Sequence, residues 1–269
     1  MSRYETRAAR GEHTGSKHRS SKHSDSKHPP INRTASEQPG SHESKKELFD
    51  GFASVAKVLS SGRRAEIVDI LAQGERPVDE ISREIDQTIA NTSQHLQLLL
   101  RAGLVKSRRD GTRIHYSLSG PAVSRLWAAV RDVAADHLAE LDELATSYLG
   151  DRSALTTMTR TELRERIGDG DLMLIDVRPE AEFRSGHIAG ATSVSLTELE
   201  TWLDELPNDR LIVAYCRGPY CVFADNAVRT LNRHGIKAVR LEEGFPEWKE
   251  AGLPVEASNT DSNIDSTGT

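Results

Sequence analysis

The sequence predicts a chain of two domains: a mainly α N-terminal half with a β-hairpin and a long helix, then an α/β half with a parallel sheet. Three observations predict this fold class. Apolar residues recur at helical spacing from Leu48, and an Asp-Gly turn between two alternating runs follows them. A long apolar stripe then extends from Pro121 to Tyr148. Short buried runs alternate with helical patterns over residues 158–256, which is typical of an α/β domain.

Composition limits the class of protein. A chain of 269 residues is long enough for two domains of ordinary size. The net charge of -6 argues against nonspecific nucleic-acid binding by the whole chain, but it allows a local basic face. No apolar run approaches the roughly 18 residues of a membrane span, and Met1–Glu5 begins no apolar signal core. We therefore expect a cytoplasmic protein with no membrane partner.

Both ends of the chain are too polar to form a core. Residues 1–46 contain much Ser, His, Lys and Arg, so we expect a disordered tail, and residues 257–269 predict a second flexible tail. The triplet Ser-Lys-His recurs in the first tail, with histidines at His18, His23 and His28. Metal binding is one interpretation of this repeat, and a solvated low-complexity tail is the interpretation that composition favours.

Residues 47–120 predict helices followed by a hairpin. Thr88 is a suitable N-cap for the last of these helices. Asp110-Gly111 then separates two alternating runs, which is a strong hairpin signal. Helices followed by a basic hairpin describe a winged helix-turn-helix, a fold that binds DNA.

Polar and basic side chains lie where such a fold meets DNA. Asn and Gln can pair with adenine, Ser and Thr can contact bases or phosphates, and the arginines of the hairpin suit phosphates or a minor groove. An ordinary solvated hairpin is the alternative, and the complete order of helix, turn, helix and wing favours DNA binding. The predicted DNA-binding residues are Thr88, Asn91, Thr92, Ser93, Gln94, His95, Lys106, Arg108, Arg109 and Arg113.

Several blocks of this half resemble the ArsR-type winged-helix repressors. They are Val78–Ile81, Thr88–Leu96, Arg101–Val105 and Gly111–Leu118, within a resemblance that covers about residues 45–120. The resemblance implies a homodimer that binds operator DNA and releases it on a signal.

Many proteins of this type sense metals through cysteines at the start of the third helix. The corresponding segment here, Arg76–Glu80, has no cysteine, which excludes thiolate metal sensing or persulfide sensing within the winged helix. A carboxylate–histidine site formed by Asp132, Asp136 and His137 stays open, although surface charge is the simpler interpretation. We predict no metal and no cofactor.

Residues 121–149 predict one long helix with an apolar stripe. A small domain leaves much of such a stripe uncovered, and a second subunit is the simplest cover, so we expect a dimerisation helix. Packing of the stripe on the winged helix of the same chain is the alternative. Residues 150–157 predict a linker.

Both cysteines of the chain lie in one segment, residues 216–221, here called the sulfur loop. Leu211–Tyr215 predicts a buried strand before it, and Val222–His234 predicts an amphipathic helix after it. A thiol between a strand end and a helix N-terminus meets backbone N–H groups and the positive end of the helix dipole, which lowers its pKa. Cys216 is therefore the candidate nucleophile.

A series of motifs over about residues 158–256 resembles the rhodanese domain. They are Asp176-Val177-Arg178, Glu182-Phe183, Gly186–Ala191, Cys216, Gly244–Trp248 and Ala251–Val255. The resemblance implies that Cys216 takes a sulfane sulfur from a donor and holds it as a persulfide for an acceptor. Arg217 would attract an anionic donor such as thiosulfate, and Gly218, Pro219 and Tyr220 would complete the loop. Supporting roles fall to Asp176, Arg178, Glu182 and His187.

The sulfur loop also departs from related loops. Phosphatases and arsenate reductases of this fold need an arginine where Val222 stands, so phosphoryl and arsenate chemistry are disfavoured. Tyr220 and Cys221 replace the small or basic residues of many sulfurtransferases, which argues against efficient thiosulfate turnover. Cys221 is either a small buried residue or a resolving thiol, and the second role needs Cα atoms within about 7 Å.

These features predict a transcriptional regulator, a repressor by resemblance, whose rhodanese-like domain carries or senses sulfane sulfur at Cys216. One alternative is a sulfurtransferase whose winged helix serves mainly for dimerisation. The other is a regulator with a catalytically inactive rhodanese domain.

Overall fold

A computed structural model describes residues 40–257. The chain forms two compact units, Met1–Leu48 and Phe49–Thr269. The predictions for residues 1–39, including the Ser-Lys-His histidines, and for residues 258–269 lie outside the described residues. In the first unit, helix α1 (His42–Leu59) already begins at His42, within the stretch predicted to be disordered. Ser41 explains this start, because its Oγ accepts a hydrogen bond from the Ser44 amide at 3.2 Å.

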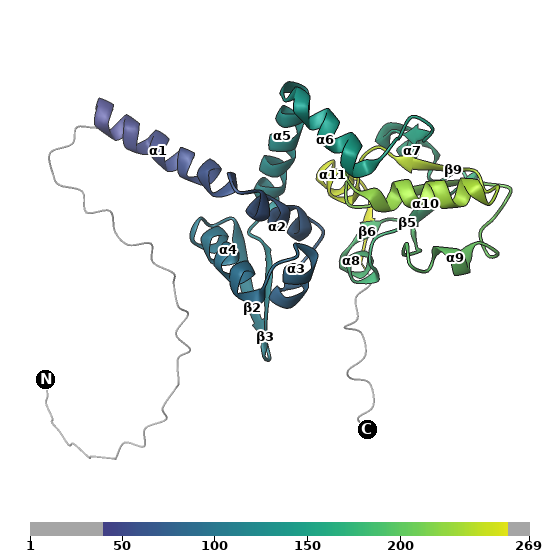
Figure 1. Cartoon of the computed structure of the whole chain (residues 1–269), viewed down its shortest axis with the longest axis horizontal. Coiled ribbons are helices and arrows are strands. Elements are labelled where there is room, and N and C mark those ends of the chain that lie inside the picture. Colours follow the sequence, from purple (N-terminus) through teal and green to yellow (C-terminus); the bar gives the residue numbers. More distant parts are fainter. Residues whose placement is uncertain (1–39, 258–269) are drawn as a thin grey trace, which may run out of the picture. The chain divides into compact units, whose positions relative to one another are not determined.

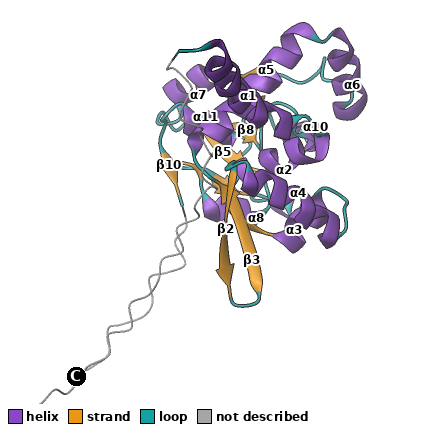
Figure 2. Cartoon of the chain, turned by 90° about the vertical axis from the view of Figure 1, so that its left-hand side faces the viewer, coloured by secondary structure: helices purple, strands orange, loops and turns teal. Residues whose placement is uncertain are grey.

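The first part of the second unit forms the predicted winged helix-turn-helix. Helices α2 (Gly62–Ala72), α3 (Val78–Glu84) and α4 (Ile89–Arg101) precede the hairpin of β2 (Val105–Asp110) and β3 (Arg113–Leu118), a long ribbon in Figure 2. A short strand, β1 (Arg76–Pro77), pairs with the other edge of β3. Fully buried aliphatic side chains from α2, α3 and α4 form the core.

The long helix predicted for residues 121–149 is two helices, α5 (Pro121–His137) and α6 (Ala139–Leu149). Leu138 between them has an extended backbone, with φ -105° and ψ 95°. Glu140 and Asp142 lie in the first turn of α6, where carboxylates stabilise a helix N-terminus, and this favours a new start.

The apolar stripe of these helices is only partly covered within the chain. Val123 and Trp127 pack on the winged-helix core. Five large apolar side chains farther along are exposed, Val130, Val133, Leu138, Leu144 and Tyr148. A second subunit that covers this part stays a prediction.

The α/β domain contains the predicted parallel sheet. Its strands are β4 (Thr157–Met158), β5 (Leu172–Asp176), β7 (Thr192–Ser193), β8 (Leu211–Tyr215) and β9 (Ala238–Leu241), in the order β4-β9-β8-β5-β7. The helices are α7 (Arg160–Arg166), α8 (Glu180–Ser185), α9 (Leu199–Trp202), α10 (Val222–Arg233) and α11 (Phe245–Glu250). Two short strands, β6 (His187–Ile188) and β10 (Val255–Glu256), pair antiparallel beside the sheet.

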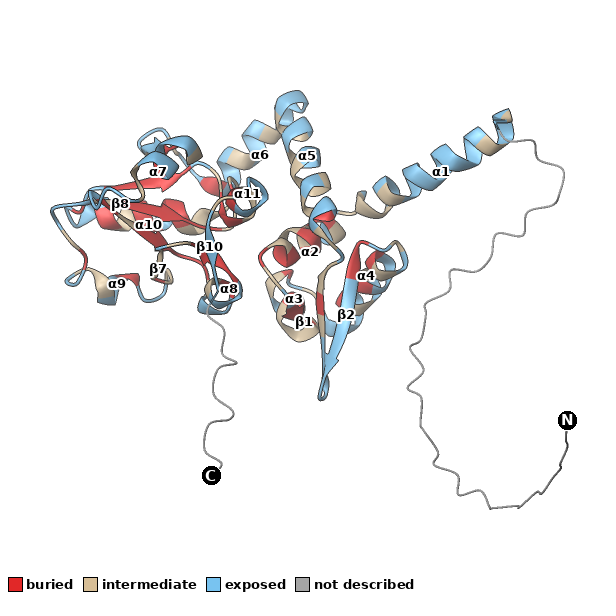
Figure 3. Cartoon of the chain, turned by 180° about the vertical axis from the view of Figure 1, so that it is seen from behind, coloured by how far each residue is buried: buried red, intermediate tan, exposed pale blue. Residues whose placement is uncertain are grey.

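Strand β8 is the centre of this sheet. It pairs with β5 on one side and β9 on the other, and helix α10 packs near β8 and β9 (Figure 1). Ile212, Val213 and Ala214 are fully buried, since a parallel sheet is covered on both faces (Figure 3). Cys216 follows β8 directly, so the most buried strand positions it. No helix within residues 40–257 is long and apolar enough to cross a membrane.

The N-cap of α4 predicts how much one hydrogen bond contributes to the stability of the winged helix-turn-helix. Thr88 accepts a hydrogen bond from the Asn91 amide at 3.2 Å, as the sequence predicts. Thr88→Ala should lower the free energy of unfolding by about 1 kcal/mol, because the amide loses its partner. Urea unfolding of the full chain measures this, and Thr88→Ser is the matched control that should keep most of the stability. Equal losses in both variants would contradict the capping role.

Candidate functional site

The sulfur loop lies between β8 and α10, at the carboxyl edge of the sheet, where open α/β sheets bind ligands. The Phe245 amide donates a hydrogen bond to the Cys216 carbonyl at 3.0 Å, which joins the start of the loop to α11. Gly244 approaches the loop so closely that a Cβ there would lie 2.3 Å from the Gly218 amide nitrogen. Gly218 itself has φ +154°, a conformation that favours glycine. Both glycines are therefore needed for this loop path.

Cys216 and Cys221 form a disulfide, with their Cα atoms 6.5 Å apart. This separation meets the distance that the resolving-thiol hypothesis requires. The two sulfur residues differ in access: Cys216 is only 2% exposed, whereas Cys221 is half-buried. A reagent from solution therefore meets Cys221 first.

Arg217 is occupied by two carboxylates. Its Nε lies 3.0 Å from Glu182 Oε1, and its Nη1 lies 2.8 Å from Glu84 Oε2 at the end of α3. Burial alone would lower the pKa of Arg217, but the charges and hydrogen bonds of Glu182 and Glu84 outweigh it and raise the pKa. The guanidinium thus stays charged and is largely neutralised by protein groups in this structure, rather than open to an anionic donor.

Asp176 and Arg178 form a buried ion pair beneath the loop, and both side chains are fully buried. Arg178 also donates to the Gly186 carbonyl at 2.7 Å, and it therefore ties the end of β5 to the start of β6. Burial alone would lower the pKa of Arg178, but Asp176 outweighs this effect and raises it. His187 stacks on the ring of Phe183, with centroids 3.7 Å apart, and its Nδ1 lies 2.8 Å from the Phe183 carbonyl.

Two winged-helix residues that the sequence analysis did not identify complete the surroundings of the loop. Gln73, only 2% exposed, donates from Nε2 to the Arg217 carbonyl at 3.1 Å and accepts from Arg178 Nη1 at 3.2 Å. Arg76 places its Nη2 2.5 Å from Glu182 Oε1 and its Nη1 3.5 Å from Glu84 Oε1. The partners that bring them to the loop, Arg178, Glu182 and Arg217, lie more than 100 residues away in the sequence, so no local pattern could have identified them.

The predicted DNA-contacting residues divide by exposure. Thr92 must be removed from the set, because it is fully buried and its hydroxyl donates to the Thr88 carbonyl at 3.0 Å. Ser93 and His95 are half-buried. The others, Thr88, Asn91, Gln94, Lys106, Arg108, Arg109 and Arg113, are exposed on α4 and the wing.

The structure does not bring together the carboxylate–histidine metal site that the sequence left open. Within residues 40–257, no three His, Cys, Asp or Glu side chains lie together as a metal site, so Asp132, Asp136 and His137 form none.

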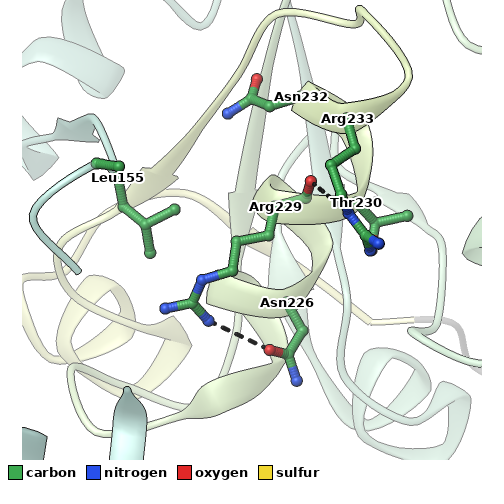
Figure 4. A pocket seen from close by; sticks show the side chains of 7 residues that line it. Leu155, Asn226, Arg229, Thr230, Asn232 and Arg233 are labelled. Carbon is green, nitrogen blue, oxygen red and sulfur yellow. Dashed lines mark hydrogen bonds between the residues drawn. The ribbon is translucent and has the colours of Figure 1, made fainter. Parts of the chain in front are cut away.

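Two cavities differ in their relation to the sulfur loop. One, of about 580 Å³, lies beside α10 and contains no cysteine (Figure 4). Its Arg229 donates to Asn226 on the same helix, as the figure shows, so its polar groups are partly occupied. The other, of about 800 Å³, reaches Cys221 and Tyr220 of the loop. The second cavity therefore offers a route to Cys221.

The buried Asp176–Arg178 pair predicts a large stability effect. Asp176→Asn leaves the Arg178 cation buried without its carboxylate, so the free energy of unfolding should fall by about 3–5 kcal/mol. The control is Asp171→Asn, which breaks the exposed pair with Arg166 and should cost less than about 1 kcal/mol. Chemical unfolding of both variants compares them, and a similar small cost would show that the buried pair is dispensable.

Comparisons with known proteins agree with this division of the chain. Residues 61–107 match the family described as bacterial regulatory protein, arsR family, and residues 159–251 match the rhodanese-like domain. The HTH-type transcriptional regulator Rv0324 of Mycobacterium tuberculosis is 45% identical over 217 residues, 81% of this chain and 95% of that protein. A sulfurtransferase of Allochromatium vinosum is 30% identical over 96 residues, 35% of this chain and 89% of that protein.

Solved structures resemble each half. The homodimeric winged helix-turn-helix DNA-binding domain (fragment 1–100) of Mb0332 from Mycobacterium bovis is 43% identical and covers 38% of this chain and 95% of its own, with a TM-score of 0.35. A rhodanese-related protein of Thermoplasma volcanium is 27% identical and covers 38% of this chain and 97% of its own, with a TM-score of 0.35. The two family matches and the near full-length similarity to Rv0324 show that the chain belongs to the ArsR family of bacterial regulators and carries a rhodanese-like domain after its DNA-binding domain.

Proposed function

We propose that this protein is a homodimeric cytoplasmic repressor whose affinity for operator DNA depends on the sulfur state of Cys216. One observation carries the proposal: Arg217, the residue after Cys216, is ion-paired with Glu84 at the end of α3. Helix α3 and the DNA-facing helix α4 form the helix-turn-helix. A change in the path of the sulfur loop therefore acts on the DNA-binding domain through Arg217.

The sulfur chemistry has two steps. The Cys216 thiolate attacks the sulfane sulfur of a donor, whose thiolate leaves with the bonding electrons, and a persulfide forms on Cys216. The Cys221 thiol then attacks Cys216 Sγ, hydrosulfide leaves, and the disulfide forms. The similarity to a sulfurtransferase supports the first step, and the 6.5 Å Cα separation supports the second.

The cellular setting suits a switch rather than a structural disulfide. Disulfides in the reducing cytoplasm are usually transient and serve catalysis or sensing. The winged helix itself has no cysteine, so the sulfur loop holds the only thiols that a sulfur signal can modify. Exposed apolar residues on α5 and α6 support the dimer, because a second subunit would cover them.

The response of DNA binding to sulfane sulfur tests the proposal. Operator affinity of the reduced protein should change by about fivefold or more after treatment with polysulfide, a typical range for coupling between two sites. Gel shift on DNA upstream of the protein's own gene measures it. Cys216→Ser should bind with the affinity of the reduced parent and show no response, and a response equal to the parent would contradict a role for Cys216.

Two further measurements separate this proposal from the two alternative functions. Steady thiosulfate:cyanide sulfur transfer with no protected operator would select the sulfurtransferase. Operator binding with no sulfur added to Cys216, by mass spectrometry, would select a regulator with an inactive rhodanese domain.

The Arg217–Glu84 contact predicts an uncoupled variant. Glu84→Gln keeps the shape of the side chain but removes the charge that holds Arg217, so the polysulfide response should shrink by about fivefold. Affinity of the reduced variant for the operator should stay close to that of the parent, because Glu84 is not among the DNA-contacting residues. Glu143→Gln, an exposed change on α6, is the matched control. An unchanged response in Glu84→Gln would show that the signal takes another route.

A further inference from the structure

The cavity of about 800 Å³ that reaches Cys221 has no role in the function proposed above. Its walls come from α2, α5, α6, the sulfur loop and the start of α10, and they include Trp127, Ala134, Leu141, Tyr148 and Tyr220. Its size and aromatic lining are those of a small-molecule site. We propose that this cavity binds a low-molecular-weight amino-acid thiol, which reduces the Cys216–Cys221 disulfide by attacking Cys221. The inference deepens the proposed function, because it names the reductant that resets the same pair.

Access to the two sulfur residues is unequal. Cys221 lines the cavity and is half-buried. Cys216 does not line it and is 2% exposed. Thiol–disulfide exchange depends on which sulfur can be approached. A thiol in the cavity therefore reaches Cys221 and not Cys216.

The chemistry of the exchange balances without a further oxidant. The bound thiolate forms a bond to Cys221 Sγ, the Cys216–Cys221 bond breaks, and its electron pair leaves on Cys216. The leaving thiolate is that of Cys216, directly after β8, whereas the attacked Cys221 is the N-cap of the twelve-residue helix α10. A second thiol then attacks the sulfur of the bound small molecule, which releases the oxidised small molecule and the Cys221 thiolate.

Polar groups of the cavity indicate a thiol that carries a carboxylate. Arg131 lines the cavity beside the loop, since a Cβ on Gly218 would lie 3.3 Å from its Nη1. Its Nη2 pairs with Glu247 and its Nη1 lies 3.5 Å from Asp69 Oδ1, whereas its buried Nε has no hydrogen-bond partner among residues 40–257. Arg131 is a cation in the wall of the cavity, and a ligand carboxylate pairs with a guanidinium through charge-assisted hydrogen bonds.

Asp69 offers the complementary group. Its Oδ1 accepts a hydrogen bond from Trp127 Nε1 at 2.7 Å, and both of its described contacts end on this oxygen. Burial raises the pKa of Asp69, and the Trp127 hydrogen bond and the Arg131 charge offset part of this rise. An ammonium group near Oδ2 would favour the ionised carboxylate, and amino-acid thiols carry both an ammonium and a carboxylate.

The test uses the full-length oxidised protein with glutathione as the probe. The reaction is quenched with N-ethylmaleimide, and peptide mass spectrometry locates the mixed disulfide. Glutathione should be found on Cys221 and the maleimide on Cys216. Glutathione on Cys216, or no disulfide to reduce after oxidation, would overturn the proposal. This measurement needs no variant and no DNA, so its outcome is independent of the operator response.

Filling the cavity tests the route. Ala134→Trp on α5 and Leu141→Trp on α6 should each slow the reduction by glutathione about tenfold, since they occupy the space before Cys221. Ala122→Trp, an exposed change at the start of α5, should react like the parent. A trialkylphosphine confirms in every sample that the disulfide is present, and circular dichroism confirms folding. Parent-like rates in a folded cavity variant would exclude the cavity as the route.

A change in the probe tests the ligand class. Glutathione diethyl ester keeps the thiol but masks both carboxylates, so it should reduce the parent about fivefold more slowly if Arg131 receives a carboxylate. Arg131→Gln should remove this difference between the two probes. Equal rates of the two probes with the parent would remove the assignment of a carboxylate-bearing thiol.

Discussion

The carboxylate of Glu182 is the constraint on which the sulfur site depends. It is 1% exposed, and arginines from both halves of the chain contact it, Arg217 from the sulfur loop and Arg76 from the winged helix. Both arginines also lie near Glu84, so two cations and two carboxylates close into a ring. A carboxylate this deeply buried is stable only when it is paired. The fold therefore keeps both arginines in place, and the sulfur loop shares one electrostatic unit with the end of α3.

Gln73 reinforces this unit with neutral hydrogen bonds. Its amide donates to the Arg217 carbonyl and accepts from Arg178, which is itself fixed by Asp176. The backbone of the sulfur loop is thus held by the DNA-binding half at the residue that follows Cys216. A sulfur atom added to Cys216, or a bond from Cys216 to Cys221, changes the loop next to Arg217, whose backbone and side chain contact Gln73 and Glu84.

The parts of this site that sequence predicted are those set by local chemistry. The strand before Cys216 and the helix after it follow from apolar periodicity over residues 211–234, and the Thr88 cap and the Asp110-Gly111 turn are short-range signals. The break at Leu138 was not predicted, because helical periodicity continues through it and only the acidic first turn of α6 indicates a new start. Thr92 was assigned to DNA because its residue type suits that role, whereas its burial depends on tertiary packing. Gln73, Arg76 and Glu84 could not be found, because the partners that bring them to the sulfur loop, Arg178, Glu182 and Arg217, lie in the other half of the chain.

The occupied state of Arg217 also bears on which sulfur donors suit the loop. A cation held by two carboxylates offers little attraction to thiosulfate, whose two negative charges would meet Glu182 and Glu84 at the same place. Donors with less charge near their reactive sulfur, such as organic persulfides, do not face this repulsion. In the function proposed above, this arrangement disfavours thiosulfate as a donor, because the arginine that would bind an anion already pairs with Glu182 and Glu84.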